Sequence, residues 1–76
     1  MQSQHRLHRI PIASSAIASV AYSPDASLEV EFTHGALYRY FAVPQSVFNA
    51  LLAAKSKGAY FSTSIRSCFP YVRLGP

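Results

Sequence analysis

The sequence predicts one α+β domain, in which a three-stranded antiparallel meander sheet packs one face against one main helix. The chain has 76 residues, which is enough for a single hydrophobic core and too few for two. Residues 28–32 (LEVEF) alternate apolar and acidic side chains, the period of a half-buried strand. Residues 47–52 instead place apolar side chains along one side of a helix. A short second helical turn and an extended C-terminal tail complete the expected fold.

Three strands are expected before the main helix. Residues 17–22 (IASVAY) form the first strand, and a cluster of turn-forming residues leads from it to the second at residues 28–32. Residues 36–41 (ALYRYF) form the third. Residues 1–13 have no clear hydrophobic period, so we interpret them as a flexible N-terminal arm and expect the domain to span residues 14–76.

The charged side chains favour one register for the hairpin between the second and third strands. If residues 33–35 form a three-residue loop with Gly35 in the left-handed conformation, Glu29 lies opposite Arg39 as an ion pair. Tyr38 and Tyr40 then join the inner face of the sheet. A two-residue loop would instead place Arg39 in the core, because a shift of one residue exchanges the two faces.

The main helix is expected to open at Pro44, because proline suits the first helical position. It should stop at about Lys55, with Gly58 in the left-handed conformation that often ends a helix. Residues 58–66 permit one or two further helical turns. Pro70 interrupts the apolar segment that follows, which is therefore expected to lie extended across the domain and not as a central strand.

The distribution of charge favours a polyanionic partner such as RNA. The formal net charge is +4, and all three acids, Asp25, Glu29 and Glu31, precede Phe32. Beyond Phe32 the charged residues are all Lys or Arg, which attract polyanions by Coulomb forces. The alternative interpretation is that the net charge serves solubility alone.

The remaining composition limits the class of protein. Cys68 is the only cysteine, so no internal disulfide can form, and a reducing, cytoplasmic location is expected. We expect neither secretion nor a membrane span, because no apolar run has the length that either requires. No catalytic residue, metal site or cofactor is predicted: nothing in the sequence brings Cys68 and His34 together, and the three glycines are isolated.

Several short motifs, taken together and in order, resemble the KTSC domain family over about residues 14–73. This family takes its name from a module at the C-terminus of some lysyl-tRNA synthetases and also occurs as short free-standing bacterial proteins. The resemblance implies a central Tyr-x-Tyr signature, a role in RNA binding and no catalytic residue. Phe69 stands where a tyrosine would be expected, so a hydrogen bond from that hydroxyl would be missing here. The motifs are Tyr38-Arg39-Tyr40-Phe41, Val43-Pro44, Ala54-Lys55-Ser56-Lys57-Gly58, Tyr60-Phe61, Ile65-Arg66 and Pro70-Tyr71.

The first functional hypothesis is a small non-enzymatic module that binds RNA. Single-stranded RNA is held by Lys and Arg along its backbone and by aromatic rings on which bases stack. The favoured register leaves Leu37, Arg39 and Phe41 on the face opposite the helix, which would be such a platform unless other strands or the tail cover it. Tyr38 and Tyr40 are expected to be structural. The candidate RNA contacts are Arg39, Phe41, Lys55, Lys57, Arg66 and Arg73.

The second hypothesis is a module for protein interaction or homo-oligomerisation. The chain has five Tyr and five Phe, and exposed aromatic residues are common anchors of protein interfaces. The absence of acids after Phe32 favours RNA over this alternative.

Overall fold

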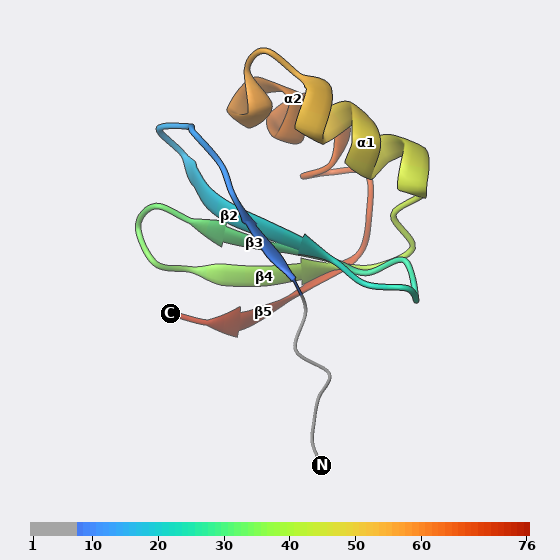
Figure 1. Ribbon diagram of the computed structural model, residues 1–76. Helices are drawn as coiled ribbons and strands as arrows, with labels where there is room; N and C mark the ends of the chain where they lie inside the picture. The colour runs from blue at the N-terminus through green and yellow to red at the C-terminus, as the bar shows by residue number, and fades with distance from the viewer. Residues whose placement is uncertain (1–7) are drawn as a thin grey trace.

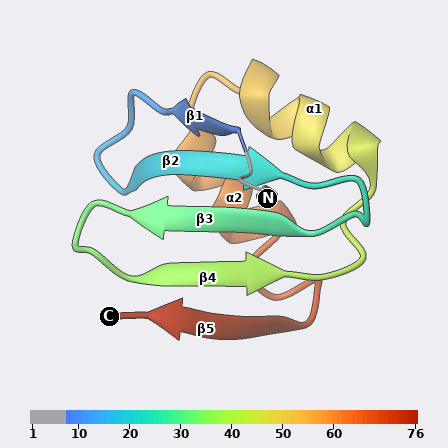
Figure 2. The ribbon, with the colours of Figure 1, turned by 60° about the horizontal axis from the view of Figure 1, so that its bottom comes forward.

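The computed structural model describes residues 8–76 and shows an antiparallel sheet with two helices on one of its faces (Figure 1). The strands are ordered in the sheet as they are along the chain (Figure 2). The α+β class and the meander are therefore confirmed. The elements are β1 Arg9–Pro11, β2 Ile17–Tyr22, β3 Leu28–Phe32, β4 Leu37–Tyr40, α1 Gln45–Ala53, α2 Lys57–Ser64 and β5 Tyr71–Gly75.

The predicted number of strands was wrong, because the described chain has five strands and not three. The two additional strands, β1 and β5, are the edges of the sheet. Strand β1 belongs to the segment interpreted as a flexible arm, of which residues 1–7 lie outside the described residues. It is too short to show a hydrophobic period. Strand β5 has no alternation of buried and exposed residues that could have revealed it. Pro70 directly precedes it, where the missing N–H removes no ladder bond of the strand.

The register of the central hairpin agrees with the three-residue loop. Glu29 lies opposite Arg39, and the Phe32 N–H donates to the Ala36 carbonyl over 2.9 Å. Gly35 has a φ of 102°, in the left-handed region that glycine adopts without strain. Tyr40 is in the core, as expected for the inner face.

The helices differ from the prediction at their ends. Pro44 is the N-cap of α1 and not its first helical residue, and α1 ends at Ala53. Gly58 does not end this helix, because it lies inside α2. The Ser56 side chain begins α2 by accepting a hydrogen bond from the Ala59 N–H, which satisfies one of the free donors of the first turn. The predicted short helical turn is therefore a separate helix of eight residues.

The hydrophobic core lies between the inner face of the sheet and the two helices. In Figure 2 the helices lie behind β1, β2 and β3, whereas β4 and β5 have no helix behind them. The helices therefore cover the inner face unevenly. The core consists of Ile17, Val20, Leu28, Val30, Tyr40, Val43, Phe48, Leu51, Phe61 and Ile65.

Candidate functional site

An open groove with aromatic walls lies at the uncovered end of the inner face. Its volume is about 410 Å³. The register between β4 and β5 places Tyr71 opposite Tyr40, so side chains from both strands reach the same face. Arg66 and Ser67, which follow α2, also line the hollow. We call this hollow the aromatic groove; its lining residues are Phe32, His34, Tyr38, Tyr40, Arg66, Ser67 and Tyr71.

Three tyrosines form one wall of the aromatic groove, and we call them the tyrosine cluster: Tyr38, Tyr40 and Tyr71. The ring centroid of Tyr71 lies 5.5 Å from that of Tyr38 and 5.5 Å from that of Tyr40. The exposed fraction is 4% for Tyr40 and 57% for Tyr71. The cluster therefore runs from a ring inside the core to a ring that is open to a ligand.

Two arginines stand beside the tyrosine cluster without an acidic partner. Arg66 lines the aromatic groove, and the guanidinium carbon of Arg73 lies 5.8 Å from the ring centroid of Tyr38, within the range of a cation–π contact. Within residues 8–76, both ion pairs use Glu29 as the acid. The positive charges of Arg66 and Arg73 are therefore not neutralised by the described part of the chain.

The hydroxyl of Tyr40 is a hydrogen-bond donor without a partner among residues 8–76. Burial, with a smaller contribution from Tyr38, raises the pKa of Tyr40, and the nearby Arg66 opposes this rise only in part. The hydroxyl therefore stays protonated at neutral pH. In the described chain, the tyrosine hydroxyl that has a hydrogen-bond partner is that of Tyr22, which donates to the Val43 carbonyl.

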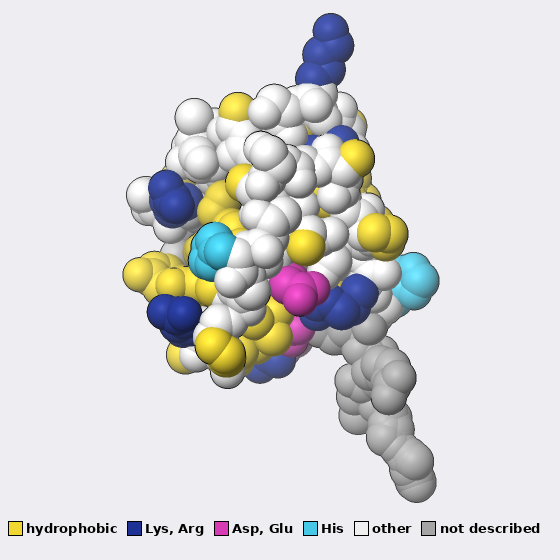
Figure 3. Space-filling model, turned by 90° about the vertical axis from the view of Figure 1, so that its left-hand side faces the viewer, with side chains coloured by type: hydrophobic (Ala, Val, Ile, Leu, Met, Phe, Trp, Pro, Cys, Tyr) yellow, Lys and Arg dark blue, Asp and Glu magenta, His cyan; other side chains and the backbone are white. Residues whose placement is uncertain are grey.

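Two further hollows extend the aromatic groove towards the start of α2. One, of about 320 Å³, shares Phe32, His34 and Arg66 with the groove. The next, of about 430 Å³, shares Ser15, Ala16, Gly58 and Ser62 with that hollow and is lined also by Lys55 and Lys57. Because neighbouring hollows share walls, the three form one continuous path, which we call the furrow. Figure 3 faces this side of the molecule, where Lys and Arg side chains lie around hydrophobic ones.

Four of the six predicted RNA contacts lie along the furrow. Lys55, Lys57 and Arg66 line it, and Arg73 lies over the ring of Tyr38. Lys57 is half-buried, and its Nζ donates to the Ala54 carbonyl over 2.9 Å. The fold thus gathers cations that are separated by up to 18 positions in the sequence (73 − 55).

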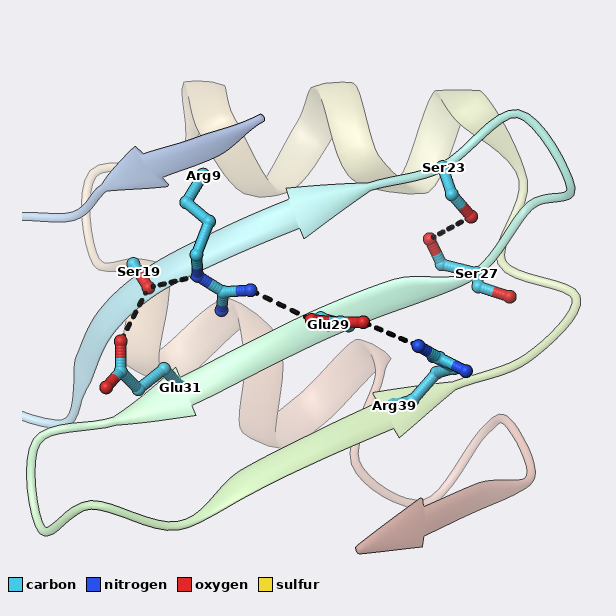
Figure 4. A network of polar contacts seen from close by, with 7 residues as sticks. All are labelled: Arg9, Ser19, Ser23, Ser27, Glu29, Glu31 and Arg39. Carbon is cyan, nitrogen blue, oxygen red and sulfur yellow. Dashed lines mark hydrogen bonds and ion pairs between the residues drawn. The ribbon is translucent and has the colours of Figure 1, made fainter. Parts of the chain in front are cut away.

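The other two predicted contacts lie outside the furrow. Arg39 is on the opposite face of the sheet, where its Nη2 atom lies 2.7 Å from Glu29 Oε2 (Figure 4). Phe41 follows β4, is 38% exposed and donates its N–H to the Pro70 carbonyl. No helix of the described chain covers this outer face (Figure 1), yet Leu37 and Arg39 are only half-exposed on it.

Glu29 is the centre of a polar network on that outer face (Figure 4). Arg9 donates to it over 2.8 Å from β1, and Arg39 donates over 2.7 Å from β4. Burial alone would raise the pKa of Glu29, but the hydrogen bonds and charges of the two arginines outweigh this effect and lower it. Arg9 also donates to Ser19, which in turn donates to Glu31. This network joins β1 to β4, so the charge of Arg39 is used within the fold.

Sequence reasoning did not assign Phe32, His34 or Tyr71 to the site. His34 stacks on Phe32 with a centroid distance of 5.7 Å at the rim of the aromatic groove. The sequence analysis placed Tyr71 in the extended tail. The Pro70-Tyr71 motif was the signal that could have indicated Tyr71 as a site residue. Cys68 is exposed and lines none of the three hollows.

The described residues contain neither a cluster of metal ligands nor a helix that could span a membrane. Among residues 8–76, no three His, Cys, Asp or Glu side chains are close enough to bind a metal ion together. No helix in that range combines the length and hydrophobicity that crossing a membrane requires.

Comparison with known proteins identifies the family. Residues 13–69 match the family model of the KTSC domain. An uncharacterised protein of Stutzerimonas stutzeri is 49% identical over 57 residues, which cover 74% of this chain and 80% of that protein. A lysine–tRNA ligase of Nostoc sp. is 41% identical over 61 residues, which are 79% of this chain but only 11% of the ligase. The crystal structure of a KTSC domain protein from Yersinia pestis is 33% identical and superposes with a TM-score of 0.85, covering 92% of this chain and all of that one. The resemblance seen in the sequence is thereby confirmed: the chain belongs to the KTSC domain family.

Proposed function

We propose that this chain is a small non-enzymatic module that binds single-stranded RNA along the furrow. The observation that carries the proposal is an aromatic groove open to solvent, with two arginines beside it that have no acidic partner in the described chain. Bases would stack on the exposed ring of Tyr71, and the phosphates would follow the cations. Single-stranded nucleic acids are commonly held by this combination of aromatic rings and positive charge.

The position of the acids supports this surface over the outer face of the sheet. Glu29 and Glu31 point away from the helices, and Glu29 is paired with Arg9 and Arg39. The furrow has no acidic residue among its lining side chains. A polyanion would therefore meet less repulsion and more uncompensated positive charge in the furrow.

The relatives give a second line of support. Similar segments of about the same length occur in lysine–tRNA ligases, proteins whose name places them on a tRNA substrate. The segment covers about a tenth of each ligase, so the ligase reaction itself is not carried over. RNA binding in the cytoplasm agrees both with this similarity to the ligases and with the single cysteine, Cys68.

The proposal is tested by NMR titration of labelled protein with a mixed-sequence single-stranded RNA at low salt. Amide shifts should gather on Tyr38, Arg66 and Tyr71 and fade as salt is added. Tyr71→Ala should weaken binding by about 1 to 3 kcal/mol, the usual value of one stacked base. Because Tyr71 is more than half exposed, this change spares the core. The matched control is Phe41→Ala, which removes an exposed aromatic ring outside the furrow and should leave the affinity unchanged.

The same titration decides between this function and protein interaction. Strand β5 is an edge of the sheet, and its Val72 and Leu74 are among the most exposed large hydrophobic side chains of residues 8–76. Such an edge can pair with another strand, from a second copy or from another protein. A lack of RNA-induced shifts, combined with a sedimentation coefficient that rises with protein concentration, would contradict RNA binding and favour assembly through β5.

A further inference from the structure

We infer that the tyrosine cluster is a subsite for one nucleoside, in which the Tyr40 hydroxyl hydrogen-bonds the ribose 2′-hydroxyl. The inference rests on the proposed function. It adds that the furrow binds RNA more tightly than DNA of the same sequence. Three features of the aromatic groove support it: a hydroxyl without a partner in the described chain, an open ring and a cation.

The unused hydroxyl belongs to Tyr40. This residue is 96% buried (100 − 4), and it lines the aromatic groove. No residue of the described chain gives its hydroxyl a hydrogen-bond partner. The hydroxyl is not fully buried, because the one fully buried side-chain N or O atom of residues 8–76 that lacks a partner is Nη2 of Arg9. It therefore meets solvent in the groove, where water satisfies it. A ligand that enters the groove displaces the water there and must therefore offer a polar group to this hydroxyl.

The open ring is that of Tyr71. It is 57% exposed and lies 5.5 Å from Tyr40, centroid to centroid. A planar base can lie against it, as bases do on aromatic side chains in single-strand binding proteins.

The cation is Arg66, which lines the same groove. It is close enough to Tyr40 for its charge to oppose the effect of burial on the pKa of that hydroxyl. Tyr40 therefore has both the cation and the open ring of Tyr71 as neighbours in the groove. In a nucleotide the ribose joins the phosphate to the base, so a phosphate at Arg66 and a base at Tyr71 would bring the ribose to Tyr40.

The hydroxyl at this central position distinguishes ribose from deoxyribose. The 2′-hydroxyl can accept the proton that Tyr40 offers, and it is the group by which proteins tell RNA from DNA. Deoxyribose has no group at that position, so binding DNA would leave the Tyr40 hydroxyl unpaired.

The test compares a short oligouridylate with the oligodeoxyuridylate of the same length, which differ in the 2′-hydroxyl alone. Affinities are measured by fluorescence anisotropy at low salt for the unaltered chain and two variants. Tyr40→Phe keeps the ring in the core and removes the hydroxyl. Because this hydroxyl has no partner within the described part of the chain, the fold should keep its stability. Tyr60→Phe is the matched control, since Tyr60 is half-buried and lines none of the three hollows.

The unaltered chain and Tyr60→Phe should bind the RNA about two- to tenfold more tightly than the DNA, the effect of one hydrogen bond. Tyr40→Phe should bind both as the unaltered chain binds DNA. Equal affinity of the unaltered chain for the two oligomers, or a preference that survives in Tyr40→Phe, would overturn this inference and leave RNA binding standing. No binding of either oligomer would overturn the proposed function as well.

Discussion

At the scale of single residues, Glu29 contributes more to the fold than to a binding surface. Each of its two carboxylate oxygens accepts a hydrogen bond from one arginine. Arg9 comes from β1 and Arg39 from β4, which lie on opposite sides of β3. The Glu29 side chain is 11% exposed, whereas those of Arg9 and Arg39 are 34% and 39% exposed, so water shields the pairs in part. Pairs of this kind stabilise a fold mainly by avoiding an uncompensated charge, so the loss of one partner is costly.

We therefore expect Glu29→Gln to lower the free energy of unfolding at pH 7 by about 1 to 3 kcal/mol, the cost of leaving charged donors without their acceptor. Because the folded pKa of Glu29 lies below its ordinary value of 4.5, its contribution is complete above that value and is lost as the pH falls through the folded pKa. Urea unfolding at neutral and at acidic pH measures the effect. The difference between the two chains should be largest near neutrality and shrink in acid.

Glu31→Gln is the control for this experiment. Glu31 lies on the same strand and face, but its bond is to the neutral Ser19 hydroxyl, over 2.9 Å. The expected loss is at most about 1 kcal/mol, with a weaker dependence on pH. Equal losses for the two variants would contradict the central position of Glu29 in the network.

At the scale of elements, the sequence predicted those strands that have one buried and one exposed face. The apolar and acidic side chains of β3 alternate in sequence, and the ion pair between Glu29 and Arg39 selected the correct register for β3 and β4. Strands β1 and β5 were missed because an edge strand can be short or exposed throughout, and then no period distinguishes it from a loop.

The candidate site was predicted in part for the same reason. The cations of the furrow were identified from charge alone, and they remain proposed contacts. The aromatic groove could not be predicted, because it exists only when β5 pairs with β4 and carries Tyr71 to Tyr38 and Tyr40. Arg39 was included because the favoured register places it on the face opposite the helix; it does lie on that face, outside the furrow, where Glu29 pairs with it.

Two glycines of the chain should respond to alanine with opposite signs. Gly58 lies in α2, and a methyl group there would meet Ser14 Oγ at 3.6 Å and Ala16 Cβ at 3.7 Å, which are ordinary contacts. Gly58→Ala should therefore stabilise the chain by up to about 1 kcal/mol through helix propensity. Gly35 has a φ of 102°, so Gly35→Ala should destabilise it by about 1 kcal/mol or more.

Thermal and urea unfolding of the two variants measure these changes. A destabilised Gly58→Ala would mean that Gly58 has the left-handed conformation expected of a helix end, and it would contradict the boundaries of α2. Gly35→Ala serves as the reference for such a loss.

At the scale of the whole molecule, charge is sorted between two surfaces. The outer face of the sheet holds Glu29 and Glu31 with the arginines that pair or bridge to them, so its positive and negative charges largely cancel. The furrow on the other side of the sheet carries cations and, among its lining residues, no acid. A polyanion that approaches the molecule should therefore be drawn to the furrow at low ionic strength.

This sorting predicts the salt dependence of RNA binding. For single strands, the logarithm of the binding constant falls with the logarithm of salt concentration by about 0.7 for each neutralised phosphate. Four cations of residues 8–76 lie along the furrow, namely Lys55, Lys57, Arg66 and Arg73, so these contacts should give a slope no steeper than about −3. Anisotropy titrations between about 50 and 200 mM salt measure it.

Variants of two arginines then locate the contact surface. Arg66→Gln should make the slope shallower by about 0.7, because one phosphate loses its cation. Arg39→Gln removes the same charge from the opposite face and should leave the slope unchanged, once NMR spectra show that the variant is folded. If the slope responded to Arg39 and not to Arg66, the RNA would lie on the outer face of the sheet, and the aromatic groove would have to be explained by a different ligand.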